Sequence, residues 1–302
     1  MVCGWAGAVG PDGQMLLNYL ASAGIDTSYI SRLEEPTGHA VIQINREGEN
    51  AIIIHGGANR KIPGSMIEKN LGAFHKGDWL LLQNEINDVD QIIRKAHGQG
   101  MTIVLNPSPV TTEMKSWPLE LVDWFVLNEI EGEDLTGRKD PEEMLTELVR
   151  RYPGARFVLT LGEKGAVYAD IRTRIRQPAI PAQVVDTTAA GDTFVGYFIA
   201  EMTRDAGIRQ ALLTAAAAAS VTISRKGAGE SIPTIGEFRN CRRNDLQKRG
   251  ASLWVRLAHP KQADAGLPEE WHFRFVIAEP EPQQPGRLHP HRSWQSQSQR
   301  RP

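Results

Sequence analysis

Residues 79–83 read Trp79-Leu-Leu-Leu-Gln83, and three more short apolar runs of this kind follow along the chain. They are Thr102-Ile-Val-Leu-Asn106, Trp124-Phe-Val-Leu127 and Phe157-Val-Leu-Thr-Leu161. Stretches with helical spacing separate the runs, namely Val89, Ile92, Ile93 and Ala96, and later Met144, Leu145, Leu148 and Val149. Apolar strands that alternate with helices are typical of a mainly parallel sheet covered on both faces. The expected fold class is therefore α/β.

Polar residues stand where these apolar runs end. They are Asn84-Glu85, Asn106, Asn128 and Gly162. In open parallel sheets, ligands bind beyond the carboxyl ends of the strands. These positions are therefore the first candidates for a binding site.

One segment departs from the alternation of strand and helix. Residues Ala40-Val-Ile-Gln-Ile44 and Ala51-Ile-Ile-Ile54 flank Asn45-Arg-Glu-Gly48, a pattern that predicts two strands joined by a hairpin turn. A hairpin in this place could be a lid, a dimer edge or an ordinary surface ribbon, and the pattern alone does not choose between them.

The composition sets broad limits on the kind of protein. The chain has 302 residues, of which 41% are apolar and 23% charged, and its net charge of −2 does not favour nucleic acid as a partner. Its two cysteines, Cys3 and Cys241, lack the spacing of a zinc site or a disulfide framework, which fits a reducing compartment. No signal peptide and no long apolar segment is recognised, so we expect a cytoplasmic protein that does not span a membrane.

The last part of the chain has a different character. Residues 241–302 contain 11 Lys and Arg against 6 Asp and Glu, together with seven Pro. This composition predicts a largely disordered basic tail after a globular unit at 1–240. Nucleic-acid binding by the tail is less favoured than an unstructured extension, because the tail lacks a dense block of basic residues.

The richest chemical signal is the run Val184-Val-Asp186-Thr-Thr-Ala-Ala-Gly191-Asp192-Thr-Phe-Val-Gly196. Small residues at the start of an apolar helix let backbone N–H groups approach an anion, and the helix dipole adds positive potential. An aspartate at that point can accept the proton of an attacking hydroxyl while the amides hold a phosphoryl group. A lone aspartate here would more often only complement the helix dipole, so the whole run carries the interpretation.

The run from Asp186 to Gly196 resembles the second signature of the ribokinase (PfkB) family of carbohydrate kinases. The similarity extends from about Val9 to Glu237 and includes further runs in the family's order. These are Val9-Gly-Pro-Asp-Gly13, His55-Gly-Gly-Ala-Asn59, Asn106-Pro-Ser-Pro109, Asn128-Glu-Ile-Glu131, Thr160-Leu-Gly-Glu-Lys-Gly165 and Arg225-Lys-Gly227. The resemblance implies a three-layer α/β/α core at 1–240 with a small β lid at about 37–59. It also implies a homodimer formed through the lid.

The resemblance implies a site for ATP-dependent phosphorylation of a sugar's primary hydroxyl. Asp192 would be the general base, the amides of Ala189, Ala190 and Gly191 the anion hole, and Glu85 a ligand of the sugar hydroxyls. A capping Asn128 or an ordinary exposed Glu85 is the plainer alternative. The residues implied in ATP binding are Asn128, Thr160, Leu161, Gly162, Glu163, Lys164, Gly165, Gly191 and Ala216.

Two cations are implied as well. Mg²⁺ would be arranged through water by Glu131, since Mg²⁺ keeps much of its hydration shell. A K⁺ site would involve Asp186, Thr188, Thr222, Arg225, Gly227 and Ser231.

The favoured substrate is D-ribose, converted to D-ribose 5-phosphate. Two sugar-contact motifs of the family, Asn-x-Asp and Gly-Gly-Lys-Gly-x-Asn, are not found, so the first sheet strand and most sugar ligands are expected to be missing. Fructose, a deoxy-keto acid or a nucleoside therefore stays open as the substrate. A nucleotide-binding fragment without catalytic activity stays open too.

Overall fold

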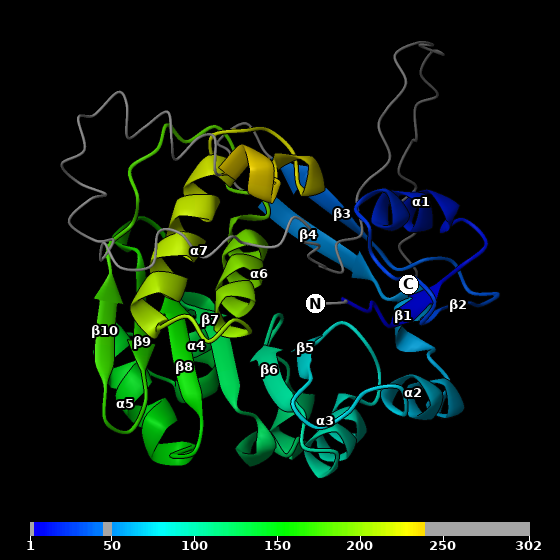
Figure 1. Ribbon diagram of the computed structural model, residues 1–302, viewed down its shortest axis with the longest axis horizontal. Coiled ribbons are helices and arrows are strands. Elements are labelled where there is room, and N and C mark those ends of the chain that lie inside the picture. The colour runs from blue at the N-terminus through cyan, green and yellow to red at the C-terminus, as the bar shows by residue number, and fades with distance from the viewer. Residues whose placement is uncertain (1–2, 45–49, 239–302) are drawn as a thin grey trace, which may run out of the picture.

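The computed structural model describes residues 3–44 and 50–238, and Figure 1 shows their arrangement. The strands are β1 (Gly7–Val9), β2 (Ile30–Arg32), β3 (His39–Ile44), β4 (Asn50–His55), β5 (Trp79–Gln83), β6 (Thr102–Asn106), β7 (Trp124–Asn128), β8 (Arg156–Thr160), β9 (Ala166–Ala169) and β10 (Arg174–Gln177). The α-helices are α1 (Gln14–Ser22), α2 (Gly64–Leu71), α3 (Val89–Gly98), α4 (Glu129–Thr136), α5 (Pro141–Arg151), α6 (Ala190–Met202) and α7 (Ile208–Thr222). The predicted tail at 241–302 lies outside the described residues.

The main sheet has six strands in the order β10-β9-β8-β7-β6-β5. Strands β5 to β8 are parallel, as the four apolar runs predict, whereas β9 is antiparallel to β8 and β10 is antiparallel to β9. The antiparallel pair was not predicted: the four apolar residues of β9 directly follow the run Thr160–Gly165, which was assigned to a nucleotide loop, and β10 has no apolar run. The predicted α/β class with a mainly parallel sheet is confirmed.

Helices cover both faces of this sheet. Successive residues of β7 alternate between two cores: Phe125 and Leu127 pack with helices α3 and α5, while Trp124 and Val126 pack with α6 and α7. In Figure 1 helices α6 and α7 stand in front of the strands and α4 and α5 lie behind them. The three-layer arrangement is therefore present.

A smaller lobe lies beside the sheet and contains α1, α2 and two small β units (Figure 1). Strands β1 and β2 form a parallel pair, and β3 and β4 pair antiparallel, as the hairpin pattern predicts, with His39 opposite His55. The predicted turn Asn45-Arg-Glu-Gly48 lies outside the described residues. Val41, Ile53 and Ile54 of this hairpin are exposed. The hairpin thus presents apolar side chains outward, as a docking or covering element does.

Among residues 3–44 and 50–238, no helix is both long and apolar enough to cross a lipid bilayer.

Candidate functional site

Asp192 occupies the first turn of α6, directly after the tight segment 186–189. Ala189 precedes the helix with φ of 59°, a left-handed conformation that L-residues seldom adopt. The first turn of a helix leaves its N–H groups without intrahelical acceptors. The predicted Ala190 amide donates to Thr187 O at 3.3 Å, whereas the amides of Gly191 and Asp192 belong to a set of backbone donors suited to an anion.

The charge of Asp192, at this helix start, acts on two other carboxyl groups, those of Glu85 and Glu131. Burial raises the pKa of Asp192, and a hydrogen bond from Gln83 lowers it by a smaller amount. Burial likewise raises the pKa of Glu85 and of Glu131, and in both cases the charge of Asp192 raises it further. The predicted base, the predicted sugar ligand and the predicted magnesium residue therefore share one partly buried site.

Gln83 and Asn106 support Asp192 from the carboxyl ends of β5 and β6. These two residues stand opposite each other in the sheet, and the Gln83 amide donates to Asn106 Oδ1 at 2.7 Å. Asn106 in turn donates to the carbonyl of Val126 at 2.8 Å. These two hydrogen bonds fix the Gln83 side-chain amide, which is the hydrogen-bond partner of Asp192. The sequence predicts Asn106 as a binding-site candidate because it ends an apolar run, whereas it predicts Gln83 only as the last residue of a strand.

Asn128 and Glu131 form a capping box at the start of α4. The Asn128 side chain accepts from Glu131 N at 2.9 Å, and Asn128 N donates to Glu131 Oε2 at 3.0 Å. The plain capping function is therefore present for Asn128. Glu131, however, is only 6% exposed, so its side chain does not face solvent. Its carboxyl group accepts hydrogen bonds from Asn128 and Ser108, and the charge of Asp192 acts on it.

The segment from Thr160 to Gly165 makes the turn from β8 to β9. Thr160 stands opposite Asn128 across the sheet, and Lys164 pairs with Glu129 at 3.8 Å, so the turn lies beside the start of α4. Gly165 has φ of 95°, and a Cβ there would lie 2.0 Å from the carbonyl oxygen of Gln177. Glycine is thus required at Gly165 by two separate constraints.

The remaining members of the predicted nucleotide site, Leu161, Gly162, Glu163 and Ala216, differ in their surroundings. Gly162 and Glu163 lie in the exposed short helix of the turn. Leu161 is buried in the core of the α3 and α5 face, and Ala216 is 8% exposed within the core of the α6 and α7 face. Ala216 therefore offers little surface to a base.

Asp186 connects two segments far apart in the sequence. Its Oδ1 accepts from Thr188 N at 2.9 Å and Thr188 Oγ1 at 2.7 Å, and its Oδ2 accepts from Gly227 N at 3.2 Å. These bonds, together with the nearby charge of Lys226, lower the pKa of Asp186. A fixed negative charge therefore stands beside the loop that follows α7.

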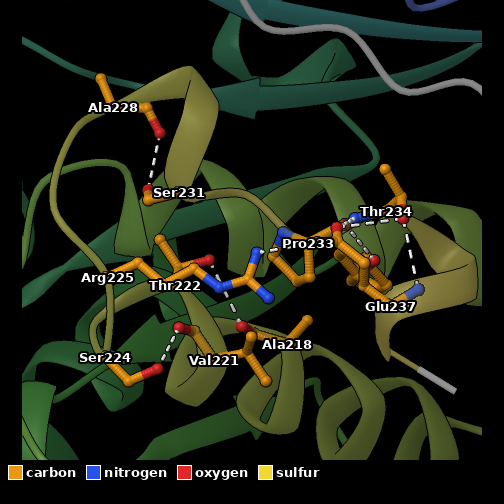
Figure 2. A network of polar contacts seen from close by, with 11 residues as sticks. Ala218, Val221, Thr222, Ser224, Arg225, Ala228, Ser231, Pro233, Thr234 and Glu237 are labelled. Atoms are coloured by element: carbon orange, nitrogen blue, oxygen red, sulfur yellow. Dashed lines mark hydrogen bonds and ion pairs between the residues drawn. The ribbon is translucent and has the colours of Figure 1, made fainter. Parts of the chain in front are cut away.

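The other residues predicted around a monovalent cation lie in the network that Figure 2 shows. Thr222 Oγ1 is buried against Ala218 O and Thr193 Oγ1, and the Arg225 guanidinium pairs with Glu237 at 3.5 Å. Ser231 Oγ donates to Ala228 O at 2.6 Å. The Thr222, Arg225 and Ser231 side chains are thus engaged with α6, α7, Glu237 and Ala228, so the oxygen atoms suited to K⁺ are backbone carbonyls and Asp186 Oδ2, which accepts one bond.

A second set of residues, which the sequence did not assign, ties down the base of the hairpin. Asp12 Oδ1 accepts from Thr37 N at 2.8 Å and from Thr37 Oγ1 at 2.7 Å, and Gly10 N donates to Thr37 Oγ1 at 2.9 Å. A Cβ on Gly10 would lie 2.2 Å from Glu35 O. The Gly-x-Asp motif therefore anchors the chain where it enters β3.

Comparison with known proteins assigns the family. The family model of the pfkB family carbohydrate kinases matches residues 3–235. A ribokinase of Haemophilus influenzae is 34% identical over 74% of this chain and 76% of its own length.

Solved structures agree with this assignment. The ribokinase of Cryptococcus neoformans var. grubii serotype A in complex with ADP is similar with a TM-score of 0.70 and 31% identity, over 79% of this chain and 82% of that one. The Arabidopsis thaliana ribokinase complexed with ribose and ATP gives a TM-score of 0.67 and 31% identity, over 79% and 81%. This chain therefore belongs to the pfkB family of carbohydrate kinases and is an ATP-dependent sugar kinase.

Proposed function

We propose that this protein transfers the γ-phosphoryl group of ATP to the 5-hydroxyl of D-ribose. The observation that carries the proposal is the placement of Asp192 in the first turn of α6, where its charge acts on the carboxyl groups of Glu85 and Glu131. The similarity to ribokinases along three quarters of the chain supports ribose and does not favour a nucleotide-binding protein without catalytic activity.

Asp192 is the proposed general base. Its carboxylate accepts the proton of the sugar hydroxyl as the sugar oxygen bonds to the γ-phosphorus and the bond to the ADP oxygen breaks. The raised pKa of Asp192 makes it a stronger proton acceptor than an exposed aspartate. The amides of Ala189, Ala190 and Gly191 hold the charge that develops on the phosphoryl oxygens.

Glu85 is the proposed ligand of the sugar hydroxyls, because it lies beside Asp192. The hairpin of β3 and β4 is the proposed lid. Its exposed residues Val41, Ile53 and Ile54 also suit a homodimer formed through this hairpin. Sedimentation of wild type and Ile53→Lys checks this, since a dimer formed there dissociates in the variant.

The proposed nucleotide site combines the turn Thr160–Gly165 with Asn128, Gly191 and Ala216, although Ala216 offers little contact surface. The described residues contain no group of three or more His, Cys, Asp or Glu arranged around a metal. This fits Mg²⁺ held through water by Glu131 and by the phosphates of ATP, where it neutralises phosphate charge.

A K⁺ ion is the proposed activator beside the anion hole. The fixed charge of Asp186 and the carbonyl groups of the loop 222–231 are suitable oxygen donors. The residues proposed around it are Asp186, Thr188, Thr222, Arg225, Gly227 and Ser231. We propose a cytoplasmic location, where ATP and reduced thiols are abundant.

A coupled ADP-release assay with ribose, ATP and Mg²⁺ tests this function. Asp192→Asn is expected to lower kcat by about 10³-fold, the range for loss of a general base. Asp90→Asn, on helix α3, is the matched control and is expected to leave kcat unchanged. Wild-type protein that phosphorylates fructose, a deoxy-keto acid or a nucleoside in place of ribose would refute the substrate. Equal rates for wild type and Asp192→Asn would refute the mechanism.

A further inference from the structure

The loop that carries Glu85 is held by a side chain from the lobe that bears the hairpin. The guanidinium group of Arg60 donates to the carbonyl of Asn84 at 2.8 Å and to the carbonyl of Ile86 at 3.0 Å. These two carbonyls belong to the residues on either side of Glu85. A planar donor group that binds both flanks restricts the backbone between them.

A second pair of bonds closes the same junction. Asn87 Oδ1 accepts from Ile62 N at 2.9 Å, and Asn87 Nδ2 donates to Ile62 O at 2.9 Å. Residues 60–62 and 84–87 are therefore joined by four hydrogen bonds, two charged and two neutral. We call these four hydrogen bonds the clasp. Hydrogen bonds from a charged donor contribute more than neutral ones, so the two bonds of Arg60 are expected to be the stronger half of the clasp.

The sequence around Arg60 is built to bring it there. Arg60 ends the short helix Gly57–Arg60, which follows β4 directly. A Cβ on Gly56 would lie 2.4 Å from Arg60 Cγ, so glycine leaves the space across which Arg60 runs. Ala58 N also donates to Pro36 O at 2.8 Å, which joins the two ends of the hairpin segment at this point.

Arg60 also balances the charge around Glu85. The charged groups that act on Glu85 are Asp192 at the start of α6, which raises its pKa, and Arg60, which lowers it. Arg60 thus favours the ionised carboxylate, the form that accepts hydrogen bonds from sugar hydroxyls.

We propose that Arg60 is a positioning residue that holds Glu85 in the sugar site and links its loop to the base of the hairpin. This inference rests on the proposed function, in which Glu85 binds the sugar. Arg60 acts through the backbone of Asn84 and Ile86, and its contribution is to binding of the sugar rather than of ATP.

The test compares three variants of the full chain. Arg60→Gln removes the charge, Arg60→Lys keeps the charge without the two-pronged geometry, and Asn87→Ala removes the neutral half of the clasp. Arg60→Gln is expected to raise the KM for ribose about tenfold, the lower range for loss of charged hydrogen bonds at a partly exposed site, with KM for ATP within about twofold.

The pH profile separates charge from structure. In Arg60→Gln the acid limb of kcat/KM for ribose is expected to move to higher pH, because Glu85 loses the positive charge that lowers its pKa. In Arg60→Lys the acid limb is expected to lie at the wild-type pH, while the KM for ribose stays above the wild-type value. Asn87→Ala is expected to raise KM without moving the limb. A limb that stays in place in Arg60→Gln, or an equal rise of both KM values, overturns the proposal.

Amide hydrogen exchange gives a readout that needs no sugar. Faster exchange at Ile62 and Asn84 in Arg60→Gln, at a temperature where the variant is folded, is the expected result. The Ile62 amide bonds Asn87 across this junction, and the Asn84 amide, which bonds Ser108 O, belongs to the segment that Arg60 holds. Unchanged exchange overturns the clasp whatever the substrate is. Wild type that fails on ribose, with faster exchange in the variant, refutes only the proposed substrate.

Discussion

The burial of Asp192 favours its proposed function in proton transfer but lowers the stability of the folded protein. Burial raises its pKa in the folded protein, so the unfolded chain releases this proton at a lower pH than the folded protein does. Above the unfolded pKa, stability therefore falls as pH rises, until the folded pKa is passed. At pH 7 an isosteric neutral side chain is expected to be more stable in this position.

Thermal unfolding of Asp192→Asn checks this expectation. The variant is expected to unfold at a higher temperature than wild type, by about 2–4 °C for each kcal/mol gained in a domain of this size. The gain should be larger at pH 8 than at pH 4, where the wild-type carboxyl group is protonated more often. A variant that unfolds below wild type at both pH values would contradict the raised pKa.

Ala189 carries backbone strain at the proposed anion hole. Its φ of 59° lies in the left-handed region, which for a residue with a Cβ costs about 1–2 kcal/mol. Ala189→Gly removes that strain. Glycine also raises the conformational entropy of the unfolded chain, which lowers the free energy of unfolding by about 0.4–1 kcal/mol. The net expectation is a gain between about 0 and 1.6 kcal/mol in the free energy of unfolding.

Ala190→Gly is the matched control for this change. Ala190 begins helix α6, so glycine relieves no strain there and is expected to lower stability by about 0.5–1 kcal/mol. Urea unfolding of the three proteins gives the comparison. A loss of stability in Ala189→Gly as large as that in Ala190→Gly would show that Ala189 is not strained.

The turn between β8 and β9 is the element whose glycines can be told apart. Gly162 and Gly165 both have positive φ, but space around Gly162 is open, whereas a Cβ on Gly165 would meet the Gln177 carbonyl. Gly162→Ala is expected to cost up to about 1.6 kcal/mol, which is the left-handed penalty less the entropy that alanine removes from the unfolded chain. Gly165→Ala adds a backbone clash and is expected to cost more and to raise KM for ATP. Similar losses in the two variants would contradict this geometry.

The sequence predicted elements well where one periodic signal was long. The four apolar runs became β5 to β8, and the spacing of Ile92, Ile93 and Leu148 placed buried helix faces correctly. It did not predict the edge strand β10, Arg174–Gln177, which lacks an apolar run, or β9, Ala166–Ala169, which is apolar but only four residues long.

The candidate site was predicted to a similar degree. The run at Asp192 identified the helix start, but nothing local to the sequence showed that Gln83 would bond Asp192 or that Arg60 would reach Asn84. Such partners are far apart along the chain and meet only through the packing of the sheet and the small lobe. Contacts of this kind are outside what a periodic pattern can indicate.

At the scale of the whole molecule, the two lobes differ in how much apolar surface they bury. The main sheet lies between two large cores, one on each face. Helix α2 of the small lobe packs Leu71 into one of these cores, and the rest of the lobe is held by two clusters of three buried residues each, Trp5, Leu20 and Ile25, and Ala8, Ala58 and Ile62. Regions with few buried apolar contacts open at a lower free energy than the global one.

Native-state hydrogen exchange is expected to resolve this difference. Amides of β1 and β2 and the amide of Leu33, which bonds Val9 O at 2.8 Å, should exchange by opening of the small lobe alone. Amides at Phe125 and Val158, in the centre of the sheet, should exchange only on global unfolding and should follow denaturant with the full slope. Because a bound sugar would touch both lobes, ribose should slow exchange in β1 and β2 more than in β7 and β8. One common opening free energy for both groups of amides would mean that the small lobe and the sheet unfold as a single unit.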